Sequence, residues 1–134
     1  MNRFQIAVIT MIFAISTIVG TRSESPLAAD APAKLLRHVV LVKFVDGAKP
    51  EQIAEAEKLF AGLKDQIQEI EDFEWGTDNS PEKISQGYTH CFLVTFKSEA
   101  DRDAYLPHKA HQAFVTKVKP LFDKVLVVDY WAKG

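Results

Sequence analysis

Histidines in apolar surroundings are the first candidates for chemistry in this chain. All four histidines lie in or beside apolar segments, and His38 and His90 each lead a run of β-branched and aromatic residues. Asp129 interrupts the apolar segment that closes the chain. A carboxylate buried there needs a partner, and a histidine suits it because the carboxylate can fix the tautomer of the ring and raise its basicity. We therefore expect His38, His90 and Asp129 to face the same interior.

A second group of polar residues, Tyr105, His108 and His111, lies close together in the sequence. His108 and His111 are three residues apart, so on one helix they would share a face. His111 and Tyr105 could form an acid/base pair, in which the imidazole takes a proton and the phenol donates a hydrogen bond to a developing oxyanion. We take Tyr105 and His111 as the candidate catalytic residues. The candidate binding residues are His38, His90, His108 and Asp129.

The same residues allow other interpretations. A histidine on an apolar face is usually a core residue with its hydrogen bonds satisfied, so the set could be a structural network without a substrate. His108-x-x-His111 with His38 or His90 could bind a divalent ion, but histidine pairs at this spacing are common by chance. No residue stands out as an axial haem ligand, so we expect no metal and no other cofactor. Cys91, the only cysteine, should face away from His90 in a strand, which argues against a Cys–His nucleophile pair.

The periodicity of apolar residues predicts the elements that position these side chains. Runs rich in β-branched residues predict strands, and apolar residues from Ile53 to Ile70 recur at spacings of three and four, which predicts one long helix. Ser98 starts a capping-box pattern, and Pro107 and Pro120 should interrupt or end the helical segments that follow it. The expected elements are a strand over residues 36–44, a helix from residue 50 to about 70, a short strand at 73–75, a strand over 88–96, two helical segments between 99 and 120, and a strand over 124–131. The order β-α-β-β-α-β predicts an α+β, ferredoxin-like fold, with a four-stranded antiparallel sheet and helices on one face.

Both faces of the predicted sheet are mostly apolar, although a sheet with helices on one side and water on the other should alternate apolar and polar residues. Helices from one chain can cover only one face, and the other would expose a larger apolar patch than monomers usually carry. We therefore expect a homodimer, formed through the sheet face that carries Val40, Phe92 and Val94. One face holds Val40, Val42, Phe44, Phe92, Val94, Phe96, Val125 and Val127, and the opposite face holds Val39, Leu41, Leu93, Leu126, Val128 and Tyr130.

The composition and the N-terminus limit the classes of function. The chain has 134 residues, 47% of them apolar and 25% charged, with a net charge of -2 and no basic stripe, so we expect no nucleic-acid partner. Arg3 precedes an apolar run from Ile6 to Gly20, which as a helix would span roughly 22 Å, short of the ~30 Å hydrocarbon core. Export signals have apolar regions of this size, and Ala29-Asp30-Ala31 offers a small-x-small cleavage site. We expect residues 1–31 to be a signal peptide and the start of a linker, and the mature protein to be periplasmic or secreted. An uncleaved membrane anchor is the alternative.

The rest of the chain, residues 35–132, resembles a known family. The matching segments are His38-Val39-Val40-Leu41-Val42-Lys43-Phe44, Gly87-Tyr88-Thr89-His90, Tyr105-Leu106-Pro107-His108-Lys109-Ala110-His111-Gln112-Ala113-Phe114 and Val127-Val128-Asp129-Tyr130. On these segments the chain is similar to the stress-responsive A/B barrel (Dabb) family. The resemblance implies that two ferredoxin-like sheets pair into a dimeric α/β barrel. One departure is Pro107-His108, where the family usually has histidine followed by proline.

The family name implies no particular activity, but one member is a plant polyketide cyclase, which closes a linear poly-β-keto chain by a cofactor-independent aldol condensation. By position, its catalytic tyrosine and histidine fall on Tyr105 and His111, and its supporting polar residues fall on His38, His90 and Asp129. The resemblance therefore implies a dimeric barrel that binds a hydrophobic carbonyl compound, with cyclase-like acid/base activity, and the N-terminus adds the expectation that this barrel is exported. The alternative is a non-enzymatic stress or assembly protein that uses the barrel only as a dimerisation core. A cavity of several hundred Å³ lined by the tyrosine and the histidine would distinguish the two.

Overall fold

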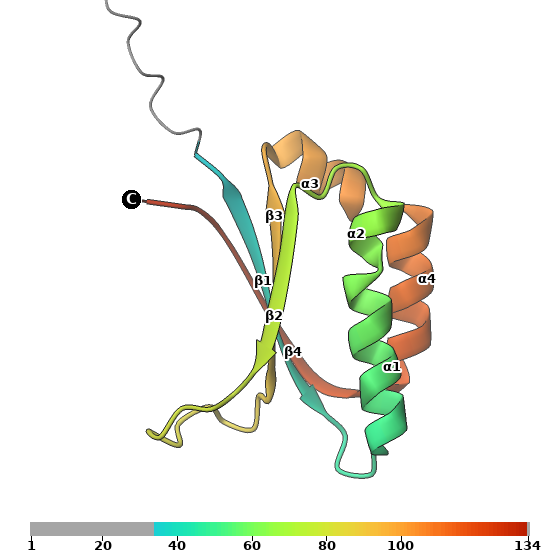
Figure 1. The fold of residues 1–134 in the computed structure, drawn as a ribbon, viewed down its shortest axis with the longest axis vertical. Helices are drawn as coiled ribbons and strands as arrows, with labels where there is room; N and C mark the ends of the chain where they lie inside the picture. Colours follow the sequence, from blue (N-terminus) through green and yellow to red (C-terminus); the bar gives the residue numbers. More distant parts are fainter. Residues whose placement is uncertain (1–33, 134) are drawn as a thin grey trace, which may run out of the picture.

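Four strands form one antiparallel sheet, and the helices lie on one side of it (Figure 1). The computed structural model describes residues 34–133. The sheet order is β2-β3-β1-β4, and the elements follow the order expected from the sequence, so the α+β, ferredoxin-like fold is confirmed. The strands are β1 Leu36–Phe44, β2 Asp72–Thr77, β3 His90–Phe96 and β4 Phe122–Trp131, and the helices are α1 Pro50–Ala61, α2 Leu63–Gln66, α3 Glu99–Tyr105 and α4 Lys109–Val118, followed by a 3-10 turn over Lys119–Leu121.

Strand β1 runs through the middle of the sheet and sets its register. It pairs with β3 on one side and β4 on the other, so that His38 lies between Val94 and Asp129. Alternate side chains of β1, from Leu36 to Phe44, are buried. This period of two is the one expected for a strand with one covered face. It places His38 and Asp129 together on the side that faces the helices.

The long helix predicted from residue 50 to about 70 is interrupted. Helix α1 ends just before Gly62, and the short α2 that follows ends at Gln66. Ile67 and Ile70 keep the spacing of three and four and are buried, although both lie beyond the last helical residue. After Gln66 the spacing of apolar residues therefore indicated burial and not continued helix.

The second helical region is divided as the sequence predicted. The Ser98 hydroxyl accepts a hydrogen bond of 3.1 Å from the backbone N–H of Asp101 and so caps α3. Pro107 lies between α3 and α4, and Nδ1 of His108 accepts a hydrogen bond of 3.1 Å from the backbone N–H of Ala110 in the first turn of α4. The corner between these two helices holds the segment with the candidate catalytic residues.

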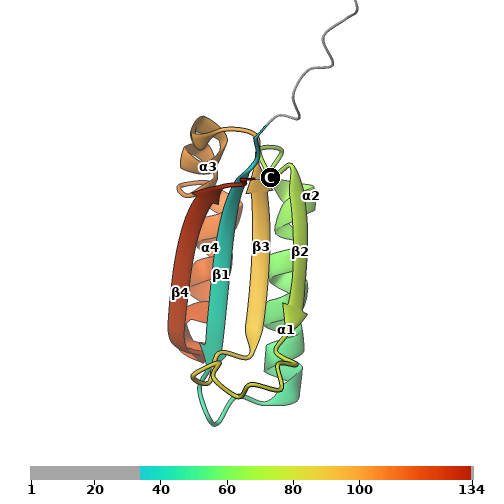
Figure 2. The same cartoon turned by 90° about the vertical axis from the view of Figure 1, so that its left-hand side faces the viewer.

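The sheet face on which we expected dimerisation is covered by helices of the same chain. Val40, Phe92 and Val94 belong to the core, and Val94 is 0% exposed. That assignment was wrong, because both faces are apolar and composition alone could not separate them. No helix lies over the opposite face among residues 34–133 (Figure 2). This uncovered face carries Val39, Leu41, Leu93, Leu126, Val128 and Tyr130.

The predicted export signal and its cleavage site lie outside the described residues. No helix among residues 34–133 is long and apolar enough to cross a membrane.

Candidate functional site

A pocket of about 540 Å³ opens between helices α3 and α4 and strands β1 and β4. A volume of this size is typical of sites for small ligands. Most of its lining is apolar, and three polar ring side chains gather in it. The pocket is lined by His38, Val40, Phe60, Tyr105, Leu106, His111, Phe114, Val115, Val118, Lys119, Phe122, Val125 and Val127.

Tyr105, the last residue of α3, has a phenol buried in this site. Its side chain is 0% exposed, and its hydroxyl has no hydrogen-bond partner among the residues that the structure describes. Burial raises the pKa of the phenol, because the charged phenolate would lose its hydration. The hydroxyl therefore stays protonated at physiological pH. It can donate a hydrogen bond to a ligand oxygen, but it cannot act as a base.

His111 lies in the first turn of α4, with its ring centroid 4.3 Å from that of Tyr105. Its Nδ1 lies 2.9 Å from the carbonyl oxygen of Leu106, and because a carbonyl only accepts, Nδ1 carries the hydrogen. In the neutral ring the lone pair is then on Nε2. Burial lowers the pKa of His111, and the hydrogen bond to Leu106 opposes this shift only in part. A neutral imidazole with a free Nε2 is suited to accept a proton.

His38 approaches the same tyrosine from the sheet. Its Nδ1 lies 2.7 Å from Oδ1 of Asp129, its neighbour on β4, and the ring centroids of His38 and Tyr105 are 5.8 Å apart. The carboxylate accepts from Nδ1–H, which again leaves the Nε2 lone pair of the neutral ring available. The structure thus brings His38, Tyr105, His111 and Asp129 together, as the sequence predicted.

Arg102 is part of this arrangement and was missed by the sequence analysis. Its Nη1 lies 3.2 Å from Oδ2 of Asp129, so the two carboxylate oxygens are divided between Arg102 and His38. The contact fixes the direction of the carboxylate. Its place in the sequence could have revealed this role, because Arg102 precedes Tyr105 by three residues and therefore lies near it on α3.

His90 does not join this cluster. It faces the helices, but it lies opposite Val42, four residues beyond His38 along β1 and so about 13 Å away. Its Nε2 bonds to Oε1 of Glu57 at 2.9 Å and its Nδ1 to the hydroxyl of Thr89 at 2.8 Å, which occupies both ring nitrogens. The expectation of one cluster was wrong for His90, since a shared sheet face does not mean a shared position along it.

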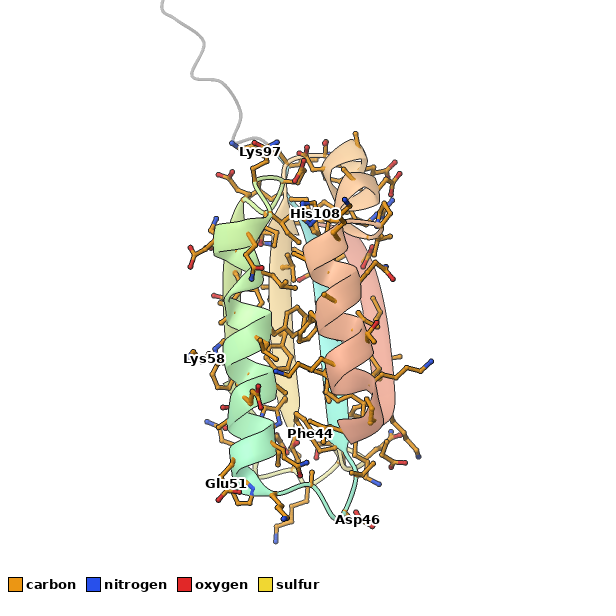
Figure 3. The ribbon with its side chains drawn as sticks, turned by 90° about the vertical axis from the view of Figure 1, so that its right-hand side faces the viewer. Phe44, Asp46, Glu51, Lys58, Lys97 and His108 are labelled. Atoms are coloured by element: carbon orange, nitrogen blue, oxygen red, sulfur yellow. The ribbon has the colours of Figure 1, made fainter. Side chains whose placement is uncertain are left out.

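His108, predicted to be a binding residue, instead makes a structural contact. It is the N-cap of α4, and its Nδ1 is occupied by the N–H of Ala110. His108 precedes the first helical residue, so it caps α4 and does not line the pocket that His111 lines. His108 lies at the end of the helical layer opposite to Phe44 (Figure 3). His90 packs against Phe44, with ring centroids 4.9 Å apart, so these two candidates lie toward opposite ends of the layer.

The geometry offers little for a metal ion. Within the described part of the chain, no group of three or more histidine, cysteine, aspartate or glutamate side chains is placed to hold one. Cys91 is exposed and alternates with the buried His90 along β3. The groups in the pocket instead suit hydrogen bonding and proton transfer at an oxygen-bearing ligand.

Residues 36–132 match the protein family described as the Stress responsive A/B Barrel Domain. The chain belongs to the stress-responsive A/B barrel family. The family member HS1 of Arabidopsis thaliana, named as a stress-response A/B barrel domain-containing protein, is 44% identical over 95 residues, which cover 71% of this chain and 87% of that protein. Olivetolic acid cyclase of Cannabis sativa is 32% identical over 95 residues, which cover 71% of this chain and 94% of that protein. The resemblance noted from the sequence is confirmed.

Solved structures with this fold include an enzyme and proteins of unknown function. The hydroxynitrile lyase from Passiflora edulis superimposes with a TM-score of 0.72 at 26% identity, covering 76% of this chain and 96% of that chain. A dimeric ferredoxin-like protein of unknown function from Jannaschia sp. gives a TM-score of 0.62 at 29% identity, covering 72% and 97%. Because this similar structure is described as dimeric, it supports the homodimer that we expected.

Proposed function

We propose that this A/B barrel protein binds a hydrophobic carbonyl compound and transfers a proton at the carbon next to the carbonyl. The observation that carries the proposal is the Tyr105 hydroxyl, which is buried and has no partner in the described part of the chain but lines a pocket of about 540 Å³. A buried donor without a partner costs free energy. A ligand carbonyl oxygen would satisfy it once a side-chain movement opened the hydroxyl to the pocket, and the apolar walls would hold the rest of the ligand.

The proton transfer uses the two histidines in different ways. With the ligand oxygen on the Tyr105 hydroxyl, Nε2 of His111 would take the proton from the α-carbon. The C–H bond breaks, an N–H bond forms, and the electron pair moves to the carbonyl oxygen as an enolate that the phenol stabilises. His38, oriented by Asp129, is a second group that can accept or return a proton. The enolate can then attack an electrophile or be reprotonated.

Two relatives support an enzymatic function by their names, olivetolic acid cyclase and hydroxynitrile lyase. The alternative is a non-enzymatic protein in which the barrel serves only for dimerisation. A filled interior would favour that alternative, whereas this interior has a pocket lined by Tyr105 and His111. The pocket therefore favours ligand binding and acid/base chemistry.

Two further parts of the proposal concern assembly and location. We propose that the homodimer forms through the uncovered face, because half-exposed apolar side chains such as Leu126 and Val128, 44% and 49% exposed, need a partner. We also propose export, which rests on Arg3 and the apolar run after it. Mass spectrometry of the natural soluble protein would contradict export if Met1 were intact.

Binding of a simple ketone tests the first half of the proposal. Decan-2-one, titrated into the protein and followed by NMR chemical shifts, should perturb the residues of the pocket. Tyr105→Phe should weaken binding by about 1 kcal/mol, or roughly fivefold, because it removes the donor to the carbonyl. Tyr88→Phe, which changes a tyrosine outside this pocket, is the matched control. Equal affinity of the wild type and Tyr105→Phe would contradict the role of the phenol.

A further inference from the structure

The pocket carries one permanent charge, and it is positive. Of the described residues that line the pocket, Lys119 alone carries a permanent charge, and none is acidic. The other polar lining groups are the phenol and the two imidazoles, which hydrogen-bond to neutral ligand groups. An anionic ligand group would therefore meet attraction at Lys119 and no carboxylate on the lining.

Lys119 lies at the opposite end of the pocket from the proton-transfer groups. It follows His111 by eight residues along α4 and the turn after it, which corresponds to about 12 Å of helix. Strand β4 gives the same separation, because Asp129 pairs with His38 near the reacting end and Val125 lines the pocket four residues away, about 13 Å along the strand.

The surface between these two ends is apolar. It is formed by Phe114, Val115 and Val118 of α4 and by Val125 and Val127 of β4. Lys119 itself is exposed, so a ligand group beside it stays in contact with water and avoids the cost of burying a charge. The pocket therefore presents a hydrogen-bonding end, an apolar middle and a cationic rim.

We propose that the ligand of this pocket is an oxo-carboxylate: a carbonyl compound whose apolar chain carries a carboxylate, held by Lys119, at the end remote from the carbonyl. This inference rests on the proposed function, since it takes Tyr105 and His111 as the carbonyl end. It adds the substrate class and assigns Lys119 as the residue that selects it. The required separation of the two polar groups is about 12 Å.

Two probes that differ only in the carboxylate test the proposal. In 9-oxodecanoate the ketone and the carboxylate lie near opposite ends of a polymethylene chain that reaches a comparable length when extended. Decan-2-one has the same chain with a methyl group in place of the carboxylate. The wild-type protein should bind 9-oxodecanoate about two- to fivefold more tightly, the upper part of the range expected for an ion pair at the surface. Raising the salt concentration should reduce this preference.

Lys119→Met is the decisive variant, because it keeps an apolar stem of similar length and removes the charge. It should lose the preference for 9-oxodecanoate, measured as the ratio of the affinities of the two probes within the variant. Lys117→Met is the matched control. Lys117 lies two residues earlier, in the last turn of α4, pairs with Glu55 and does not line this pocket, so the variant should keep the preference.

The outcomes separate this inference from the proposed function. If the wild type binds both probes equally, or if Lys119→Met and Lys117→Met change the preference alike, the oxo-carboxylate assignment is overturned and ketone binding stands. If neither probe binds, both proposals are overturned. A preference lost only in Lys119→Met supports the assignment.

Discussion

Tyr105 combines complete burial with a hydroxyl that no described protein group satisfies. If the phenol belonged to the core alone, its hydroxyl would normally have found a partner, because most buried polar groups do. Here it is flanked by His38 and His111, whose ring centroids lie 5.8 and 4.3 Å from its own. The residue therefore carries a cost in the free protein that a ligand can remove.

Removal of this hydroxyl should stabilise the free protein. Tyr105→Phe keeps the aromatic packing against Phe96, with ring centroids 5.2 Å apart, and deletes the unpartnered group. We expect the free energy of unfolding to rise by up to about 1 kcal/mol, measured by urea denaturation. A loss of more than about 1 kcal/mol would mean that the hydroxyl has a stabilising partner, which contradicts its availability to a ligand.

His111 should make folding depend on pH. Burial lowers its pKa below the ordinary value of 6.5, so between the two pKa values the unfolded chain binds more protons than the folded one. The stabilisation is present above pH 6.5 and is lost as the pH falls through the lowered pKa. Urea midpoints at pH 7.5 and 5.5 should therefore differ less in His111→Gln than in the wild type. An unchanged difference would contradict the burial of this imidazole.

At the scale of elements, strand periodicity was a reliable guide, whereas helix periodicity predicted the start of the first helix correctly and its end wrongly. Strand β1 has the predicted bounds, because alternate burial is the direct consequence of a sheet with one covered face. The prediction of helix past Gln66 was wrong because Ile67 and Ile70 can be buried at that spacing without helical backbone. The cap formed by His108 was not predicted either, since histidine is not among the usual N-cap residues.

The cap assigned to His108 can be tested by stability. His108→Ala removes the acceptor for the N–H of Ala110 and should lower the free energy of unfolding by about 1 kcal/mol. His108→Asn, which supplies a side-chain oxygen that favours this position, should recover most of that loss. If asparagine and alanine destabilised the protein equally in urea denaturation, the side chain would have a role other than the cap.

Across the whole molecule, part of the site followed from the sequence and part did not. The pairing of His38 with Asp129 could be predicted, because two polar residues in apolar strands of one sheet have few partners except each other. The separation of His90 from them could not, because register along the sheet depends on pairing between distant strands. The same limit explains the wrong dimer face, since both faces of the sheet are apolar.

Dimerisation through the uncovered face predicts different results at two neighbouring positions. Leu93→Asp places a charge on that face and should give a folded monomer, because the charge would have to be buried in the interface. Val94→Asp places it in the core and should unfold the chain. Ile84→Asp, at a loop residue that is 69% exposed, is the control.

Light scattering coupled to size exclusion gives the mass, and circular dichroism reports the fold. A dimeric Leu93→Asp variant would reject the uncovered face as the interface.

The central claim is proton transfer at a bound carbonyl compound, and hydrogen exchange measures that step alone. Decan-2-one in D2O should gain deuterium at its α-carbons in the presence of the protein, as followed by NMR. His111→Ala should lower the catalysed rate at least about 100-fold, the usual contribution of a general base, while the Tyr88→Phe variant should match the wild type. An exchange rate no faster than in buffer, or one unchanged by His111→Ala, would contradict the claim.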